Sequence, residues 1–181
     1  IEEKPVTTLI RQTLGKTISH PEMPVKTLSL METAAEKWVA LTRRIATIEK
    51  RSTYADPNLI RHLYDLTCIY QQIKVERPLI ELITRIVQQD REQFKTHNLT
   101  YAENPAHESK KAIVILRDSQ VWKQAWQEFT ELMVYGDQKL DFKTSIKTSN
   151  EASQPIIAAL TKLEHELEKS TPLSWLDQRY Q

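Results

Sequence analysis

Two long cationic side chains occupy one side of a predicted helix. Lys37 and Arg44 are seven residues apart, close to two helical turns, in a stretch whose apolar residues recur at helical spacing. That spacing predicts a helix from Leu30 to about Lys50. An ammonium and a guanidinium on one side could hold a triphosphate in a shared cleft, the first as a point charge and the second as a bidentate fork. The same spacing also fits solvated cations at the edge of an amphipathic helix.

Asp65 is the acid that best complements these cations. Asp56-Pro57 predicts the start of a second helix, with an acid before it and proline in its first turn, and Asp65 borders the apolar stripe of that helix. A partly buried carboxylate needs a cationic partner, and Lys37 on the preceding helix is the candidate. The alternative is a surface pair with Arg61, four residues earlier on the same helix.

Two further residues could support such a site. Ser29 followed by Glu32 is a capping-box pattern, so Glu32 has a structural explanation at the start of the first helix. His62, next to Arg61, could bind phosphate or titrate near neutral pH, although a single histidine on a helix also fits a structural role.

The composition describes a globular protein about one domain long. The 181 residues are 40% hydrophobic and 27% charged, and no apolar run approaches the length of a membrane span. Lys and Arg number 25 against 24 Asp and Glu, so the net charge indicates no nucleic-acid partner. The single cysteine, Cys68, excludes an intramolecular disulfide and a cysteine-based zinc site, and fits a reducing cytoplasm. One group of bases could form a local basic surface or complement a helix C-terminus: Arg43, Arg44, Lys50 and Arg51.

The predicted fold is mainly α, a helical bundle of about five to six helices with a small non-helical N-terminal portion. The two glycines, Gly15 and Gly136, are too few for an all-β fold. Short connections between the first three helices favour antiparallel neighbours. The other expected elements are a helix over 5–14, a strand over 25–28, a helix from Arg77-Pro78, a polar loop over 97–108, a helix from Asp118 or Ser119 to Gly136, an ambiguous segment over 139–150 that could be extended, a helix from Pro155 to about Lys169, and a tail from Ser170.

The stretch from Val25 to Leu66 resembles the third and fourth signature motifs of the AbiEii/AbiGii-type toxin nucleotidyltransferases, named for abortive infection. The pattern is Glu-x4-Lys-x2-Ala-Leu-x2-Arg, followed by Arg-His/Asp-x-x-Asp-Leu. Beyond Ile73 the likeness is only of type, a helical C-terminal region. Nine positions agree in the same order and separation: Glu32, Lys37, Ala40, Leu41, Arg44, Arg61, His62, Asp65 and Leu66.

The resemblance implies transfer of a nucleotide from a nucleoside triphosphate (NTP) to an acceptor, which is RNA such as the 3′ end of tRNA, or a protein. It implies that Lys37 contacts phosphates and that Asp65 is the essential carboxylate, both as catalytic residues. Arg44 and Arg61 would help to bind the nucleotide, with Glu32 and His62 in support. It also implies an antitoxin protein as a partner.

The family's upstream Gly-Ser and Asp-x-Asp motifs, which place the nucleotide and hold Mg²⁺, do not occur in this chain; Asp137 and Asp141 are four apart and follow the other motifs. We therefore expect Mg²⁺ and NTP as cofactors of the complete protein and predict no metal ligand here. Residues 1–28 would be the end of a nucleotidyltransferase core and residues 29–181 a helical C-terminal domain, inactive alone. A first residue of Ile1 rather than Met fits a processed or cut piece.

The alternative interpretation is a helical protein-interaction module without catalysis. Two of the residues that could anchor a partner, Trp122 and Trp126, are also explained by core packing. An independent hydrolase finds no support, since the chain has neither a His-Glu-x-x-His motif nor a glycine-rich phosphate loop. The candidate anchors are Trp122, Trp126, Trp175 and Tyr180.

Overall fold

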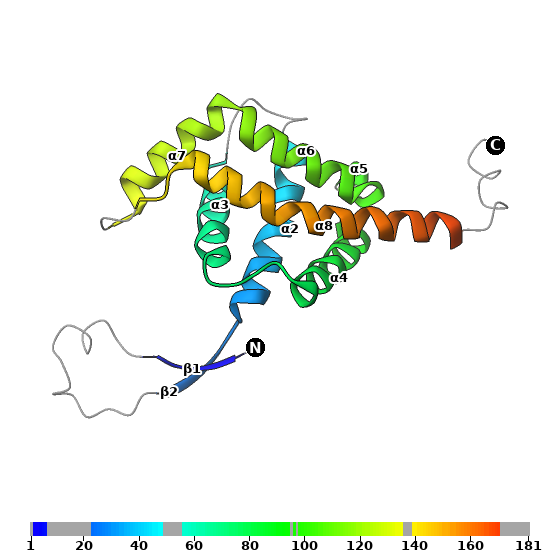
Figure 1. Ribbon diagram of the computed structural model, residues 1–181, viewed down its shortest axis with the longest axis horizontal. Coiled ribbons are helices and arrows are strands. Elements are labelled where there is room, and N and C mark those ends of the chain that lie inside the picture. Colours follow the sequence, from blue (N-terminus) through cyan, green and yellow to red (C-terminus); the bar gives the residue numbers. More distant parts are fainter. Residues whose placement is uncertain are drawn as a thin grey trace.

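The computed structural model describes residues 2–6, 23–48, 56–94, 96, 98–135 and 139–170. The described residues are mainly helical, as the composition predicts, with seven helices where about five to six were expected (Figure 1). Their elements are β1 (Glu2–Val6), β2 (Met23–Thr27), α2 (Leu30–Ile48), α3 (Pro57–Tyr70), α4 (Arg77–Phe94), α5 (Leu99–Glu103), α6 (Pro105–Asp118), α7 (Gln120–Met133) and α8 (Phe142–Ser170).

Helix α2 is the central element of the helical part. It packs against α3, α4 and α6, while α8 lies across α3, α4 and α6 and also contacts α7 (Figure 1). Trp38 and Leu41 of α2 are fully buried, as are Leu63 and Leu66 of α3. Each such side chain contributes about 1.5–3 kcal/mol of hydrophobic stabilisation. The core therefore fixes how α2 and α3 are rotated, and with them the polar residues on their remaining sides.

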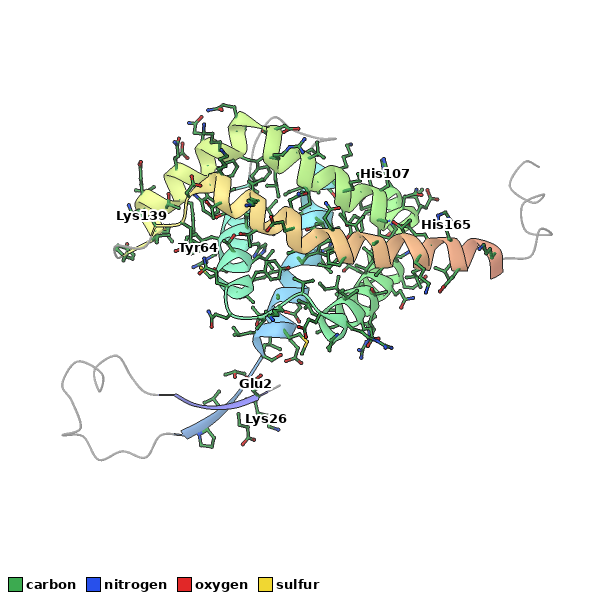
Figure 2. All side chains as sticks on the ribbon, in the orientation of Figure 1. Glu2, Lys26, Tyr64, His107, Lys139 and His165 are labelled. Atoms are coloured by element: carbon green, nitrogen blue, oxygen red, sulfur yellow. The ribbon has the colours of Figure 1, made fainter. Side chains whose placement is uncertain are left out.

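The strands β1 and β2 form an antiparallel hairpin that lies apart from the helices in Figure 1. Figure 2 shows Glu2 and Lys26 on this arm. The strand expected near 25–28 is confirmed by β2. The helix expected over 5–14 is wrong at Pro5 and Val6, which pair with Pro24 and Met23, because pairing with β2 outweighs any local helical tendency. The rest of that prediction, with Gly15, lies outside the described residues.

The segment 97–108, expected to be a loop, is helical on both sides of Asn104. The side-chain oxygen of Asn98 accepts the N–H of Tyr101 at 3.3 Å and so caps α5. Pro105 then occupies the first turn of α6, where its missing N–H costs nothing. Asn104-Pro105 is therefore a junction between two helices, and the apolar residues 112–116 belong to α6. His97 lies outside the described residues.

The segment 139–150 is not extended beyond its first three residues, because α8 begins at Phe142 and continues through Pro155. The Asp141 carboxylate accepts the N–H of Thr144 at 2.8 Å, which caps the helix. A row of buried serines, Ser145, Ser149 and Ser153, faces the core alongside the buried Ile146 and Ala152. The small size and polar character of the serines hid this half of the helix from the hydrophobic pattern.

The starts of α2, α3 and α4 agree with the sequence, and Ser119 immediately precedes α7. Helix α7 ends at Met133, and Gly136 is not among the described residues. The tail after Ser170 also lies outside them. Of the helices that the structure describes, none is both long and apolar enough to cross a membrane.

Candidate functional site

One side of α2 is left partly uncovered by the neighbouring helices, and it carries Lys37, Ala40 and Arg44. Lys37 and Ala40 are half-buried and Arg44 is exposed, whereas Leu41 between them is fully buried. Residues three and four apart lie on the same side of a helix, so these three form one continuous row. The sequence motif therefore includes the row of α2 that faces outward beside α3.

Two ion pairs join this row to α3. The Lys37 ammonium donates to Asp65 Oδ2 at 2.7 Å, and the Arg44 guanidinium donates to Asp56 Oδ2 at 2.5 Å. Lys37, the earlier residue on α2, pairs with Asp65 on α3, whereas Arg44 pairs with Asp56 just before α3. This reversed order is expected for antiparallel neighbours. Asp65 thus has the partner predicted for it, and the side chains of Lys37 and Asp65 are 24% and 34% exposed.

The structure adds Asp56, which the sequence identified only as an acid preceding α3. Its carboxylate takes part in the site through the pair with Arg44, while its backbone carbonyl accepts the N–H of Leu59. An antiparallel register anchored at Lys37–Asp65 would have pointed to an acid near position 58, opposite Arg44. That register was the signal by which the sequence could have identified Asp56 as a site residue.

His62 lies between the two ion pairs. In the register they define, position 62 is opposite Ala40, whose small side chain separates Lys37 from Arg44. Burial lowers the pKa of His62, the charges of Lys37 and Arg44 lower it further, and Asp65 and Asp56 partly oppose them. The net effect favours the neutral imidazole. Its Nδ1 is buried and finds no hydrogen-bond partner among the described residues.

Arg61 and Glu32 stand apart from this cluster. Arg61 is exposed on α3 and forms no ion pair within the described part of the chain. Glu32 closes the capping box at the start of α2: its Oε2 accepts the backbone N–H of Ser29 at 2.9 Å, and its own N–H donates to the Ser29 hydroxyl at 3.1 Å. These contacts with Ser29 lower the pKa of Glu32, chiefly through the backbone N–H. The two remain predicted site residues that the geometry does not join to Lys37.

An aromatic cluster holds the other side of α3. The ring of Tyr64 packs on Trp126 and Phe129 of α7, with ring centroids 5.7 Å and 5.5 Å apart. These contacts fix the rotation of α3 that turns Asp65 toward α2. Trp122 and Trp126 are 4% and 2% exposed, so both are core residues and neither offers its side chain to a partner. The other two candidate anchors, Trp175 and Tyr180, lie outside the described residues.

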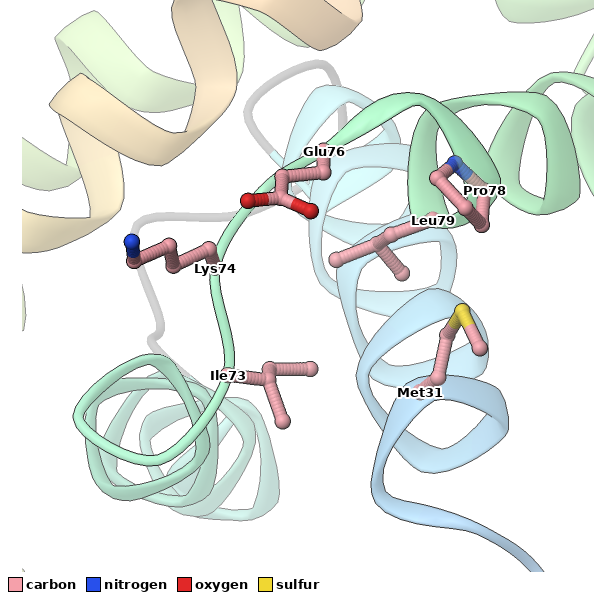
Figure 3. Close-up of a pocket in the computed structure, with 6 residues that line it drawn as sticks. All are labelled: Met31, Ile73, Lys74, Glu76, Pro78 and Leu79. Carbon is pink, nitrogen blue, oxygen red and sulfur yellow. The ribbon is translucent and has the colours of Figure 1, made fainter.

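A pocket of about 250 Å³ lies beside Met31 at the start of α2 (Figure 3). Lys74 and Glu76 are exposed, whereas Leu79 is buried. None of the charged residues of α2 and α3 described above lines it. Its lining residues are Met31, Ile73, Lys74, Glu76, Pro78 and Leu79. The pocket therefore does not coincide with the candidate site.

The described residues do not fit a magnesium ion. Within them, no three His, Cys, Asp or Glu side chains come together in a way that could hold a metal. Asp65 and Asp56, the two acids of the cluster, each face a cationic side chain instead. Oxygen ligands for Mg²⁺ would have to come from elsewhere.

Comparison with known proteins gives one family. A family model described as the nucleotidyl transferase AbiEii toxin of a type IV toxin–antitoxin (TA) system matches residues 1–151. The match includes the hairpin, helices α2 to α7 and the first part of α8. No curated protein and no solved structure shows a significant match to the chain.

Proposed function

Because the chain belongs to the AbiEii nucleotidyl transferase toxin family of type IV TA systems, we propose that its α2–α3 cluster binds the triphosphate of an NTP. The observation that carries this proposal is the 2.7 Å contact between Lys37 and Asp65, two motif residues 28 positions apart. It places an oriented ammonium group at a partly exposed surface. Arg44 supplies a second cation on the same row.

The roles follow from the geometry. Asp65 holds the Lys37 ammonium in one position, which lowers the entropy that Lys37 loses when it contacts a phosphate. Arg44 is seven residues further along α2, about 10 Å at 1.5 Å per residue, so the two cations suit different phosphate groups of one ligand. Arg61, exposed on α3 but outside the cluster, would make at most an outer contact with the ligand.

In nucleotidyl transfer, an acceptor hydroxyl oxygen forms a bond to the α-phosphorus, the bond to the bridging oxygen breaks, and pyrophosphate leaves. Negative charge grows on the leaving pyrophosphate, and fixed cations stabilise it. Lys37 and Arg44 would act at this point. The acceptor in our proposal is an RNA 3′ end, such as that of tRNA, or a protein, and an antitoxin is a second partner; the setting is the cytoplasm.

We further propose that this chain binds NTP without transferring the nucleotide. The family's Asp-x-Asp motif supplies Mg²⁺ ligands, and this chain contains no such motif. Nucleotide transfer by the chain alone, measured as pyrophosphate release with Mg²⁺ and an RNA acceptor, would contradict this part of the proposal.

Calorimetry with ATP, GTP, CTP and UTP, with and without Mg²⁺, tests the binding site. We expect weak binding by the native chain and a loss of at least about tenfold in affinity for Lys37→Ala and Asp65→Ala, since a hydrogen bond to a charged group contributes about 1.5–3 kcal/mol. Lys110→Ala is the matched control, because Lys110 is an exposed lysine on α6. Equal binding by the native chain and Lys37→Ala, with unchanged helical content, would refute the proposal.

A charge-reversed pair separates binding from packing. Lys37→Asp and Asp65→Lys should each lower stability by less than about 1 kcal/mol, because the pair is partly exposed. The double variant should regain that stability but not the affinity for NTP, since its ammonium then projects from α3. Full recovery of binding would mean that only the helix–helix contact matters. Urea denaturation and calorimetry give the two readouts.

A further inference from the structure

The α2–α3 cluster is electrically balanced as it stands. Lys37 is paired with Asp65 and Arg44 with Asp56, so the two positive charges are offset by two negative ones. A polyphosphate brings several negative charges to this surface. A further positive charge beside the two ion pairs would therefore favour its binding.

His62 is the group that can supply that charge. The charged groups acting on its imidazole come from both helices packed here: Lys37 and Arg44 on α2, and Asp65 and Asp56 on and before α3. On the side toward α7, the neighbouring Tyr64 meets aromatic rings. The imidazole therefore lies within the field of any anion held between the two cations.

The ring also has an unused hydrogen-bonding position. Its Nδ1 is buried and has no hydrogen-bond partner in the described part of the structure. A buried polar atom without a partner is uncommon in native proteins and calls for an explanation, such as an ordered water, a bound ion or a functional role. His62 thus has a ring nitrogen without a hydrogen-bond partner among the described residues and lies between two ion pairs.

We infer that His62 is a third positive group of this site, and that binding of a polyphosphate between Lys37 and Arg44 is accompanied by uptake of one proton by the imidazole. The inference rests on the proposed function. The proton comes from solvent, moves to an imidazole nitrogen, and no covalent bond of the ligand changes. An imidazolium facing a phosphate oxygen is a charge-assisted contact.

The direction of the pH dependence follows from linkage. Without ligand, burial and the two cations favour the neutral ring and lower its pKa. A bound anion favours the charged ring and raises that pKa. Affinity is therefore highest at low pH and falls as the pH rises through the interval between the free and bound pKa values, by up to about tenfold per pH unit for one proton.

The test is calorimetry of the chain with inorganic tripolyphosphate, free of metal ions, in buffers of different ionisation enthalpy. The change of the observed enthalpy with the buffer enthalpy gives the number of protons taken up. We expect uptake approaching one proton in that interval, reduced in His62→Gln to the amount due to the ligand's own terminal phosphates. His107→Gln is the control, because the His107 side chain is 74% exposed and lies well away from Tyr64 and its end of α3 in Figure 2.

The outcomes separate this inference from the proposed function. Binding that Lys37→Ala abolishes, but with equal proton uptake in the native chain and His62→Gln, would overturn the inference and leave the proposed function standing. No binding of tripolyphosphate or of ATP by the native chain would overturn both. Binding of ATP much more tightly than tripolyphosphate would assign part of the affinity to the nucleoside.

A second measurement needs no substitution that affects folding. The imidazole proton resonances of the native chain report the protonation of each histidine as the pH is varied. The resonance of His62 should titrate at a higher pH with tripolyphosphate than without it. An unchanged His62 titration at saturating ligand would refute the inference.

Discussion

At the scale of single residues, two adjacent arginines of α2 show how position on a helix decides the role of a side chain. Arg43 Nε lies 3.0 Å from Asp90 Oδ2 on α4, and both side chains are largely buried. Burial raises the pKa of Asp90 and the charge of Arg43 opposes that change. Arg44, one position later, faces α3 and the candidate site. The pair Arg43–Asp90 is structural, because it ties α2 to α4.

The capping box at Ser29 and Glu32 is a residue-scale feature that pH can test. The Glu32 pKa is lowered in the folded state, so its stabilising contribution is present above the ordinary value of 4.5 and is lost as the pH falls through the folded pKa. Ser29→Ala should lower the free energy of unfolding by about 1 kcal/mol near neutral pH. The difference from the native chain should shrink on acidification toward about pH 3.

Urea denaturation across this pH range measures the effect. Glu36→Gln is the control, because Glu36 is an exposed acid on the same helix and does not take part in the cap. A difference between Ser29→Ala and the native chain that stays constant down to low pH would show that the bond from the Ser29 hydroxyl to the Glu32 carboxylate contributes nothing to the cap.

At the scale of elements, α8 joins most of the fold through an unusual face. Ser153 is buried, accepts a hydrogen bond from the indole N–H of Trp38 at 3.0 Å, and donates one to the Ser149 carbonyl at 2.7 Å. These bonds satisfy polar groups that the core would otherwise leave unpaired. Pro155 lies two residues beyond, inside the helix but exposed to solvent.

Replacing Pro155 tests whether α8 is one continuous helix. Proline in a helix interior removes one backbone hydrogen bond and costs up to about 3 kcal/mol relative to alanine. Pro155→Ala should therefore raise the free energy of unfolding, as measured by chemical denaturation. Gln154→Ala, at the neighbouring exposed position, should change it by less than about 0.5 kcal/mol. A loss of stability in Pro155→Ala would contradict a continuous α8.

At the scale of the whole molecule, the helices hold a core that the hairpin does not share. Every residue of the described core cluster lies between α2 and α8 or in their connections. β1 and β2 pair with each other, and a two-stranded sheet alone is marginally stable in water. This arrangement agrees with the division at residues 28 and 29, which remains a prediction.

A chain of residues 29–181 should keep its fold on that account. We expect helical circular dichroism, a single cooperative thermal transition, and a free energy of unfolding within about 1 kcal/mol of that of the full chain, since little core surface is lost. Loss of cooperativity would show that the hairpin is part of the helical domain. A chain that also carries Leu63→Ala, which removes a fully buried side chain, serves as the destabilised reference.

Much of this protein was determined by local sequence. The capping box at Ser29, the proline after Asp56 and the apolar periodicity of each segment predicted α2 and α3, because caps, turns and helix periods depend on residues close together in the chain. The pairing of Lys37 with Asp65 was predicted from the need of a partly buried carboxylate for a cationic partner. The tertiary structure alone decided the rest. The register of the two packed helices brings Asp56 to Arg44 and places His62 between the two ion pairs. The role of the buried serines of α8 follows from the contact of Ser153 with Trp38, which only the tertiary structure shows. The pattern of a single helix does not indicate which neighbouring helix covers each of its sides. In this protein the neighbours of α2 leave the row with Lys37 and Arg44 partly exposed.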